Sequence, residues 1–504
     1  MMLSVLIWIP LVGALVTSLW PGRWSGQRVW QLSLVLQAFS LLWAIFLAAQ
    51  FDTQQSGLQF LESVPWIEAL GLTYQLGVDG LSLPLLLINS LLGVVAVYAS
   101  PVAIQRPRLY FSLILLINAA VAGAFLSQNL LLFFIFYELE LIPLYLLIAI
   151  WGGARRGYAA TKFLIYTALS GALILGAFLG VAWLGGATTF NYDPTLAQSL
   201  TLVQQGILLG AILIGFGIKI PLFPFHTWLP DAHVEASTPV SVLLAGVLLK
   251  LGTYGLIRFG LQLFPDAWAA FAPWLASWAV VSVLYGSFAA IAQNDMKKMV
   301  AYSSIGHMGS VLLAAAAATP LAVLGTVMQM VSHGLISALL FLLVGVVYAK
   351  TGTRDLRILR GLLNPERGLP IIGSLMILGV MASGGIPGMV GFVSEFVVFR
   401  ASFLAFHSQT LLCMVGSGLT AVYFLLLVNR AFFGRLAVTA PSDKVELDVM
   451  LPPVAWRDHL PAIVLALIIV VLGLQPHWLT RWTEVTTLAM RSPVTDIAQI
   501  STSF

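Results

Sequence analysis

Charged residues and cysteine are both scarce in this 504-residue chain. Only 9% of the residues are charged and 60% are hydrophobic, with a mean hydropathy of +0.97. A soluble domain carries about 25% charged residues, so we expect a protein built for a lipid bilayer. The formal net charge is only +4, and the sequence gives no indication of nucleic acid binding.

The single cysteine, Cys413, excludes intrachain disulfides, a C-x-x-C pair and a cysteine-ligated iron–sulfur cluster within the chain. No glycine-rich dinucleotide motif or P-loop pattern occurs. We therefore expect the chain to handle neither electrons nor nucleotides by itself, and to carry no cofactor and no metal of its own. His226, Asp231 and His233 have a spacing suggestive of zinc ligands, but they form no convincing cluster.

Long apolar runs occupy most of the sequence. A membrane span needs about 20 mostly apolar residues, and the sequence predicts fourteen spans in an all-α polytopic membrane protein. The first run has no basic n-region and no small-residue cleavage signal, so we expect a retained span. The predicted spans are 2–20, 30–50, 81–99, 109–126, 129–151, 162–184, 203–224, 238–263, 270–292, 299–318, 321–349, 370–403, 409–433 and 460–480.

Basic residues gather in the loops that follow odd-numbered spans. Loops after even-numbered spans are acidic or neutral, so the positive-inside rule places both termini on the non-cytoplasmic side. One loop, 225–237, should be cytoplasmic and yet has no Lys or Arg. The basic loop residues are Arg23, Arg28, Arg106, Arg108, Arg155, Arg156, Lys162, Lys297, Lys298, Lys350, Arg354, Arg357, Arg360, Arg367, Arg430, Arg435, Lys444 and Arg457.

A few titratable residues fall deep inside the apolar runs. Each central charge costs about 2.5–3.5 kcal/mol on insertion scales, so these groups must pair, neutralise or line water. Alternating Glu, Lys and His favours a proton relay. The alternative is structural, with buried pairs and histidine hydrogen bonds that lock helices together. The candidate relay residues are Glu138, Lys219, Lys250, His307, His333 and Glu395.

Glu138 and Glu140 are two residues apart, about 200° around a helix. Only one of them is expected to point along a given pathway. The other is expected to meet a neighbouring helix or another subunit.

Two predicted spans contain helix breaks. Pro221 and Pro224 interrupt a helix beside Lys219, and the glycine-rich stretch 382–392 precedes Glu395. Such breaks are tolerated at membrane depth only within protein or beside a water-lined cavity. Paired broken spans predict inverted repeats around an ion path, although plain packing kinks are the alternative. The expected organisation is a three-helix segment (1–100), a five-helix repeat (109–263), a second inverted repeat (270–435) and a C-terminal part (436–504).

Several stretches resemble the antiporter-like membrane subunits of respiratory complex I, over residues 75–435. They are FYELELIPLYLLIAIWGG, GIKIPLFPFHTWLPDAHVEASTP, NDMKKMVAYSSIGHMG, SHGLISALLFL and GGIPGMVGFVSEF. More narrowly, the chain resembles the M-type subunits (the NuoM/NdhD family) of the cyanobacterial NdhD type. Glu395 favours that type, since the L- and N-type relatives usually carry lysine there. Tyr137 departs from the tryptophan expected before Glu138, and the segment with His226 and His233 matches the family's ordinary sequence.

The resemblance implies fourteen spans with two inverted five-helix repeats. It also implies a buried Glu138–Lys219 ion pair, Lys250 as the central relay, and Glu395 as the exit-side group. His307 and His333 match family positions along the same hydrated axis.

The function implied is proton translocation in a NAD(P)H or ferredoxin–plastoquinone oxidoreductase, driven by redox chemistry in other subunits. Iron–sulfur clusters and quinone would belong to those partners, which include other antiporter-like and small membrane subunits and, indirectly, the peripheral redox arm. The implied location is the cyanobacterial thylakoid membrane, with lumenal termini and no nucleic acid partner.

Three alternatives stay open at this point. The stretches 360–392 and 453–479 resemble the CO2-uptake variants of the complex, which would need a carbonic-anhydrase-like partner. A second possibility is the large subunit of a multi-subunit cation/proton antiporter. A third is a purely structural membrane anchor, in which neutralising the buried charges would be harmless or stabilising.

Overall fold

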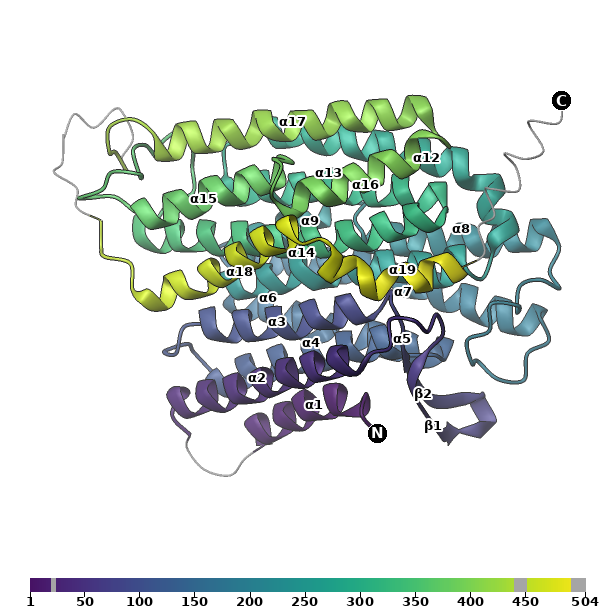
Figure 1. Cartoon of the computed structure of the whole chain (residues 1–504). Coiled ribbons are helices and arrows are strands. Elements are labelled where there is room, and N and C mark those ends of the chain that lie inside the picture. Colours follow the sequence, from purple (N-terminus) through teal and green to yellow (C-terminus); the bar gives the residue numbers. More distant parts are fainter. Residues whose placement is uncertain (20–23, 439–450, 491–504) are drawn as a thin grey trace.

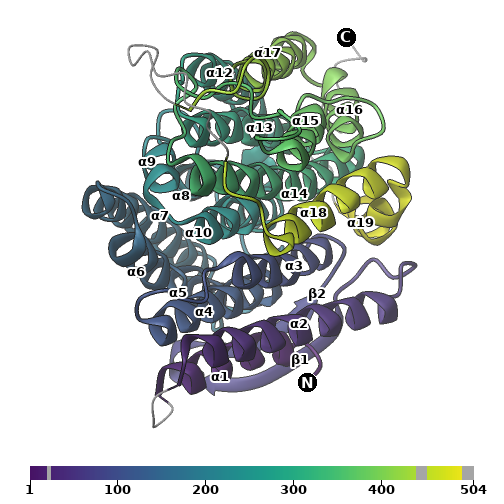
Figure 2. The ribbon, with the colours of Figure 1, turned by 90° about the vertical axis from the view of Figure 1, so that its left-hand side faces the viewer.

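The protein is a single bundle of helices that run side by side (Figure 1) and are seen end-on in Figure 2. The computed structural model describes residues 1–19, 24–438 and 451–490. Of the basic residues assigned above to loops, Arg23 and Lys444 lie outside the described residues.

The first half of the bundle begins with α1 (Ser4–Leu19), α2 (Gly26–Gln50) and α3 (Leu83–Ala99). It continues with α4 (Pro107–Leu126), α5 (Leu130–Leu139), α6 (Leu141–Trp151), α7 (Arg156–Leu184), α8 (Leu202–Lys219) and α9 (Trp228–Glu235). Its last span consists of α10 (Thr238–Leu243), the π-helical turn η2 (Leu244–Leu248), α11 (Leu249–Gly255) and a second π-helical turn, η3 (Leu256–Leu261).

The second half contains α12 (Pro265–Ile291), α13 (Met296–Ala317) and α14 (Pro320–Thr351). These are followed by α15 (Pro370–Ser383), α16 (Val390–Phe403), α17 (His407–Phe432), α18 (Trp456–Leu474) and α19 (His477–Ala489). Among the described residues, eleven helices are long and apolar enough to cross a membrane, and three shorter apolar helices are α1, α3 and α15. Together these fourteen match the predicted spans, so the polytopic helical fold is confirmed.

A β-hairpin that the sequence analysis missed projects from the N-terminal part (Figure 1). Its antiparallel strands are β1 (Gln59–Ile67) and β2 (Leu72–Val78), joined by the 3-10 turn η1 (Glu68–Leu70). Gly71 adopts φ +62° at the turn, a conformation that suits glycine. The Glu62 carboxylate accepts a hydrogen bond from Leu3 N at 2.7 Å and so ties the hairpin to the start of α1.

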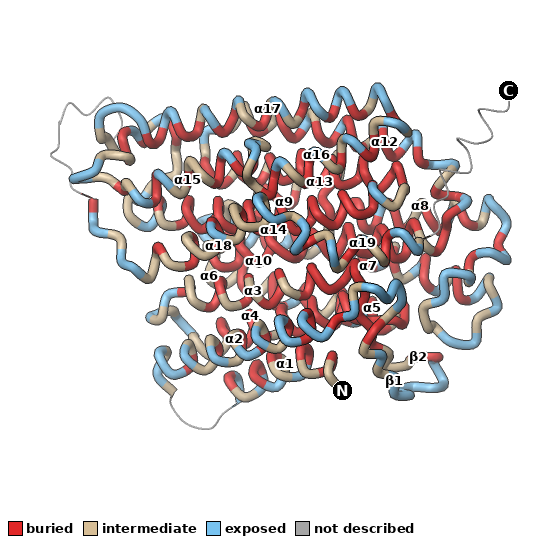
Figure 3. The backbone as a smooth tube through the Cα atoms, viewed as in Figure 1, coloured by how far each residue is buried: buried red, intermediate tan, exposed pale blue. Residues whose placement is uncertain are grey.

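Helix α14 forms the centre of the bundle. It packs against α3, α10, α13, α15, α16, α18 and α19. Figure 3 shows its backbone largely buried, whereas α1, α2 and α17 expose one side. Polar residues on α14 can therefore face several neighbouring helices without contacting lipid.

Both predicted helix breaks are present. Residues 220–227 separate α8 from α9, and residues 384–389 separate α15 from α16. A further break was not predicted: α5 ends at Leu139 and α6 begins at Leu141. Pro143 has no N–H to donate to the carbonyl of Leu139, so the helical hydrogen bonding is interrupted at Glu140.

The segment 225–237, which has no Lys or Arg of its own, receives basic side chains from neighbouring helices. Lys162 Nζ donates to Asp231 Oδ2 at 2.8 Å, and Lys297 Nζ donates to the carbonyl of Ala236 at 2.7 Å. This segment therefore lies among cationic groups, although its own sequence does not supply them.

Candidate functional site

Lys219 and Glu140 form a buried ion pair where two spans are interrupted. Lys219 is the last residue of α8, Glu140 lies at the α5–α6 junction, and Lys219 Nζ donates to Glu140 Oε1. Both side chains are almost fully enclosed by protein. The lysine ammonium also lies 4.8 Å from the centroid of the Tyr137 ring, within cation–π range.

This pairing differs from the Glu138–Lys219 ion pair expected from the family resemblance. Glu138 lies within electrostatic range of Lys219 but holds no hydrogen bond in the part of the chain that the structure describes. It shares a helix face with Ile135 and Ile142, which are 37% and 55% exposed. The two glutamates point to different sides, as predicted, and Glu140 is the one that faces the interior.

Lys250 contacts His333 at the centre of the bundle. Lys250 follows the π-helical turn η2, and its Nζ lies 2.8 Å from His333 Nδ1 on α14 and 2.5 Å from the carbonyl oxygen of Ala245. Glycines allow this approach, because a Cβ at Gly334 would lie 2.7 Å from the carbonyl oxygen of Gly246. The turn η2 thus provides the close helix–helix contact, and Lys250 follows it at the start of α11.

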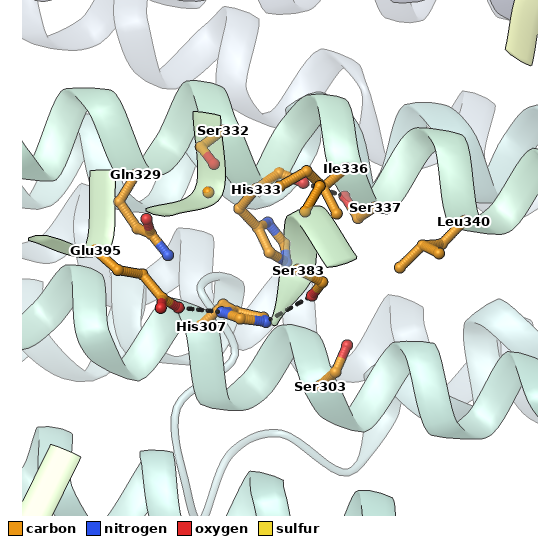
Figure 4. Close-up of a pocket in the computed structure, with 12 residues that line it drawn as sticks. Ser303, His307, Gln329, Ser332, His333, Ile336, Ser337, Leu340, Ser383 and Glu395 are labelled. Carbon is orange, nitrogen blue, oxygen red and sulfur yellow. Dashed lines mark hydrogen bonds and ion pairs between the residues drawn. The ribbon is translucent and has the colours of Figure 1, made fainter. Parts of the chain in front are cut away.

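His307 joins α13 to the second broken span. Its Nδ1 lies 3.3 Å from Glu395 Oε1 on α16, and its Nε2 lies 3.0 Å from Ser383 Oγ at the end of α15 (Figure 4). Ser417 donates to the other Glu395 oxygen at 2.7 Å. The ring centroids of His307 and His333 are 5.8 Å apart. Lys250, His333, His307 and Glu395 therefore lie one after another in space, although not in this order along the chain.

A small cavity lies among His307, His333 and Glu395 (Figure 4). It encloses ≈ 10 Å³ in which the centre of a water molecule fits, which is room for about one water. Its lining includes Ser303, His307, Gln329, His333 and Glu395. Gln329 Oε1 and His333 Nε2 are buried without a protein partner among the described residues, and such atoms ordinarily bond to water.

The structure therefore brings five of the six predicted site residues into direct or near contact with other titratable groups. Lys219 contacts Glu140, and the stem of Lys219 packs against α11, since a Cβ at Gly252 would lie 3.3 Å from Lys219 Cβ. Lys250 precedes Gly252 by two residues on the same helix. Glu138 alone lies to one side of this line.

A second buried ion pair was missed by sequence reasoning. Arg258 Nη2 donates to Asp79 Oδ2 at 2.5 Å, and both side chains are 5% exposed. The guanidinium also reaches Tyr254 and Gln262. Asp79 precedes the predicted span 81–99, and Arg258 lies near the end of the predicted span 238–263. They are 179 residues apart, so the sequence contains no local signal of their contact.

The histidines considered as zinc ligands do not converge. His226 packs against the rings of Phe223 and Tyr285, and His233 stacks on Phe341 at 4.3 Å. Asp231 binds Lys162. Within residues 1–19, 24–438 and 451–490, no group of three or more His, Cys, Asp or Glu side chains is placed to hold a metal ion.

A helical bundle with interrupted spans and a buried row of Glu, Lys and His defines an antiporter-like membrane subunit. Residues 127–420 match the family described as NADH:quinone oxidoreductase/Mrp antiporter, TM. The chain is 42% identical to NAD(P)H-quinone oxidoreductase chain 4 2 of Thermosynechococcus vestitus over 497 residues, 97% of this chain and 91% of that protein. It is 41% identical to chain 4-2 of Synechocystis sp. over 522 residues, 98% and 92% of the two chains.

Solved structures share the fold. A chain of respiratory complex I from Thermus thermophilus with bound NADH superposes with a TM-score of 0.86, at 26% identity and covering 98% of this chain and 100% of that chain. A chain of the Mrp complex from Dietzia sp. has a TM-score of 0.83 at 20% identity, covering 99% and 98%. The second likeness shows the fold alone.

The protein belongs to the NAD(P)H-quinone oxidoreductase chain 4 (NdhD) family, whose members are antiporter-like subunits of a complex I-type translocase. The resemblance inferred from the sequence motifs is thereby confirmed at the level of the family. The chain is an integral membrane protein.

Proposed function

We propose that this chain translocates protons in a cyanobacterial-type NAD(P)H or ferredoxin–plastoquinone oxidoreductase. The observation that carries the proposal is the buried series Lys250, His333, His307 and Glu395, in which each group lies near the next. Groups that accept and release protons, placed at hydrogen-bond or single-water separation, can pass a proton along the series.

The proposed relay starts at the Glu138, Glu140 and Lys219 group and ends at Glu395. Lys250 is the central carrier, because it lies between the Lys219 region and His333. Ser383 orients His307, and Ser417 orients Glu395. Shifting one buried charge changes the proton affinity of its neighbour. A potential of 100 mV corresponds to about 2.3 kcal/mol per charge moved, so redox energy suffices to drive such a switch.

Other subunits would supply the electron transfer. With only Cys413, the chain cannot build a cysteine-ligated iron–sulfur cluster. The proposed partners are therefore subunits that carry iron–sulfur clusters and quinone, together with other antiporter-like and small membrane subunits. We place the chain in the thylakoid membrane with both termini lumenal, a proposal supported by its cyanobacterial relatives and by its basic loops.

The CO2-uptake form of the complex is a narrower proposal. It is supported by the sequence of the stretches 360–392 and 453–479. A carbonic-anhydrase-like subunit would then accompany this chain. Identification of every protein that co-purifies with the tagged chain tests this form: such a subunit supports it, and a redox complex without one contradicts it.

A second candidate function is the large subunit of a multi-subunit cation/proton antiporter. This candidate is supported by the family description, which includes Mrp antiporters, and by the fold shared with a chain of the Mrp complex. The same purification separates the two: iron–sulfur and quinone-site subunits support the redox-driven pump. Recovery of small membrane subunits alone, with sodium-dependent proton exchange in vesicles, would instead establish the antiporter.

A further inference from the structure

Two carboxylates compete for one lysine at the α5–α6 junction. Glu140 is fully buried and accepts a hydrogen bond from Lys219. Glu138 is partly exposed, on the face that carries Ile135 and Ile142, and is an electrostatic neighbour of the same lysine. The Lys219 ammonium thus has an inner partner to which it is hydrogen-bonded, Glu140, and an outer carboxylate with which it interacts electrostatically, Glu138.

Glu140 retains a free position for a proton. Its Oε1 binds Lys219, whereas its Oε2 is buried with no hydrogen-bond partner in the described part of the chain. A buried oxygen atom of this kind is costly unless it bonds water or takes a proton. Protonation of Oε2 would remove the negative charge that holds the lysine.

An aromatic ring lies beside the Lys219 ammonium. Lys219 Nζ lies 4.8 Å from the Tyr137 ring centroid, and an aromatic face stabilises a cation. The Tyr137 hydroxyl lies 2.9 Å from Ser170 Oγ, which in turn donates to the carbonyl of Gly215 at 2.7 Å. These bonds fix the ring beside the lysine.

The Glu138 carboxylate lies against a glycine of the neighbouring helix. Its carboxylate lies against Gly171 of α7, where an added Cβ would come within 2.1 Å of Glu138 Oε1. The outer carboxylate therefore occupies space beside α7 that a side chain at position 171 would fill. It lies between the buried interior and the partly exposed side of the chain.

We propose that the Lys219 ammonium exchanges between Glu140 and Glu138, so that Glu140 is a second proton-accepting residue of the relay. One proton adds to Glu140 Oε2, the neutral acid releases the ammonium, and the ammonium passes Tyr137 to Glu138. Glu138 loses its own proton as the cation arrives, and Lys219 keeps its proton throughout. This half of the exchange takes up one proton inside and releases one at the outer side. In the return half Glu138 takes up a proton from the outer side, the ammonium returns to Glu140, and Glu140 gives up its proton to the interior, which is the direction of the proposed relay. This inference rests on the proposed function.

Carbodiimide labelling of the intact complex tests the exchange. A hydrophobic carbodiimide reacts with protonated carboxyl groups in membranes, and peptide mass spectrometry reads the modification at Glu138. Wild type and Lys219→Met are expected to be labelled. Glu140→Gln transfers the ammonium to Glu138 permanently and is expected to lower the labelling at least fivefold. The double variant Glu140→Gln with Lys219→Met should restore it.

Equal labelling of Glu138 in wild type and Glu140→Gln would overturn the proposal, as would an unlabelled Glu138 in Lys219→Met. Proton pumping by the purified complex in liposomes provides the second readout. The pumping rate of Glu140→Gln is expected to fall at least tenfold. Glu140→Asp keeps the carboxylate and should retain part of the wild-type pumping rate. If Lys250→Met abolishes pumping and Glu140→Gln does not, the proposed exchange is wrong while the proposed function stands. If Lys250→Met pumps normally, the proposed function itself fails.

Discussion

Lys250 of α11 and His333 of α14 face each other, with 2.8 Å between Nζ and Nδ1. They are 83 residues apart in sequence, and the contact requires that the two backbones approach closely at Gly246 and Gly334. The lysine also donates to the carbonyl of Ala245 in the preceding π-helical turn. Helix geometry and packing together therefore position the central group of the proposed relay.

Substitution of Gly334 by alanine should separate the two helices. The new Cβ would lie 2.7 Å from the Gly246 carbonyl oxygen, closer than any normal contact, so the backbones must move apart and lengthen the Lys250–His333 distance. We expect proton pumping in liposomes to fall several-fold while the subunit still assembles. Gly176→Ala is the matched control, because a Cβ at Gly176 meets nothing within 4 Å. Equal pumping by the two variants would contradict this explanation.

Glu395→Gln should block the last step of the proposed relay. The amide keeps the shape of the side chain but cannot accept and release a proton beside His307. Loss of a positioned acid–base group typically costs about 100-fold or more, so pumping should fall below detection in the liposome assay. Glu366→Gln, at an exposed carboxylate, should pump at the wild-type rate. A normal rate for Glu395→Gln would exclude this residue from the relay.

The Asp79–Arg258 pair is predicted to stabilise the bundle rather than to carry protons. Removing one partner of a buried ion pair costs about 3–5 kcal/mol, whereas replacing both is often tolerated. Asp79→Asn should therefore lower the temperature at which the detergent-purified complex loses this subunit. Adding Arg258→Met should recover part of the loss. If Asp79→Asn leaves that temperature unchanged, the pair contributes little to the fold.

The helical fold could be predicted from the sequence because bilayer spans leave a strong local signal. Each run of about 20 apolar residues marks a helix, and Pro221 and Pro224 mark the break beside Lys219. The hairpin of β1 and β2 was missed because its strands are short, β1 contains Pro65, and both lie in a segment that connects two predicted spans. The break at Glu140 has a local cause, Pro143, which helps explain why Glu140 and not Glu138 meets Lys219.

The candidate site could be predicted only as a set of residue types. Buried charge is costly in a membrane, so Lys219, Lys250 and Glu395 were recognisable one by one. Their partners depend on tertiary packing: neither the approach of Lys250 to His333 nor the Asp79–Arg258 pair leaves a trace in local sequence. The roles of these residues, and the two inverted repeats, stay predictions.

Proton pumping by the Lys250→Met variant decides whether the buried relay carries protons. The purified complex is placed in liposomes, and proton uptake is measured with a fluorescent dye during quinone reduction, beside Lys350→Met, whose ammonium lies near the end of α14 and bonds an exposed carbonyl. The relay predicts that Lys250→Met falls below about one tenth of the wild-type rate while Lys350→Met is unaffected. Pumping by Lys250→Met at the wild-type rate would exclude Lys250 as the central proton carrier and contradict the proposed relay.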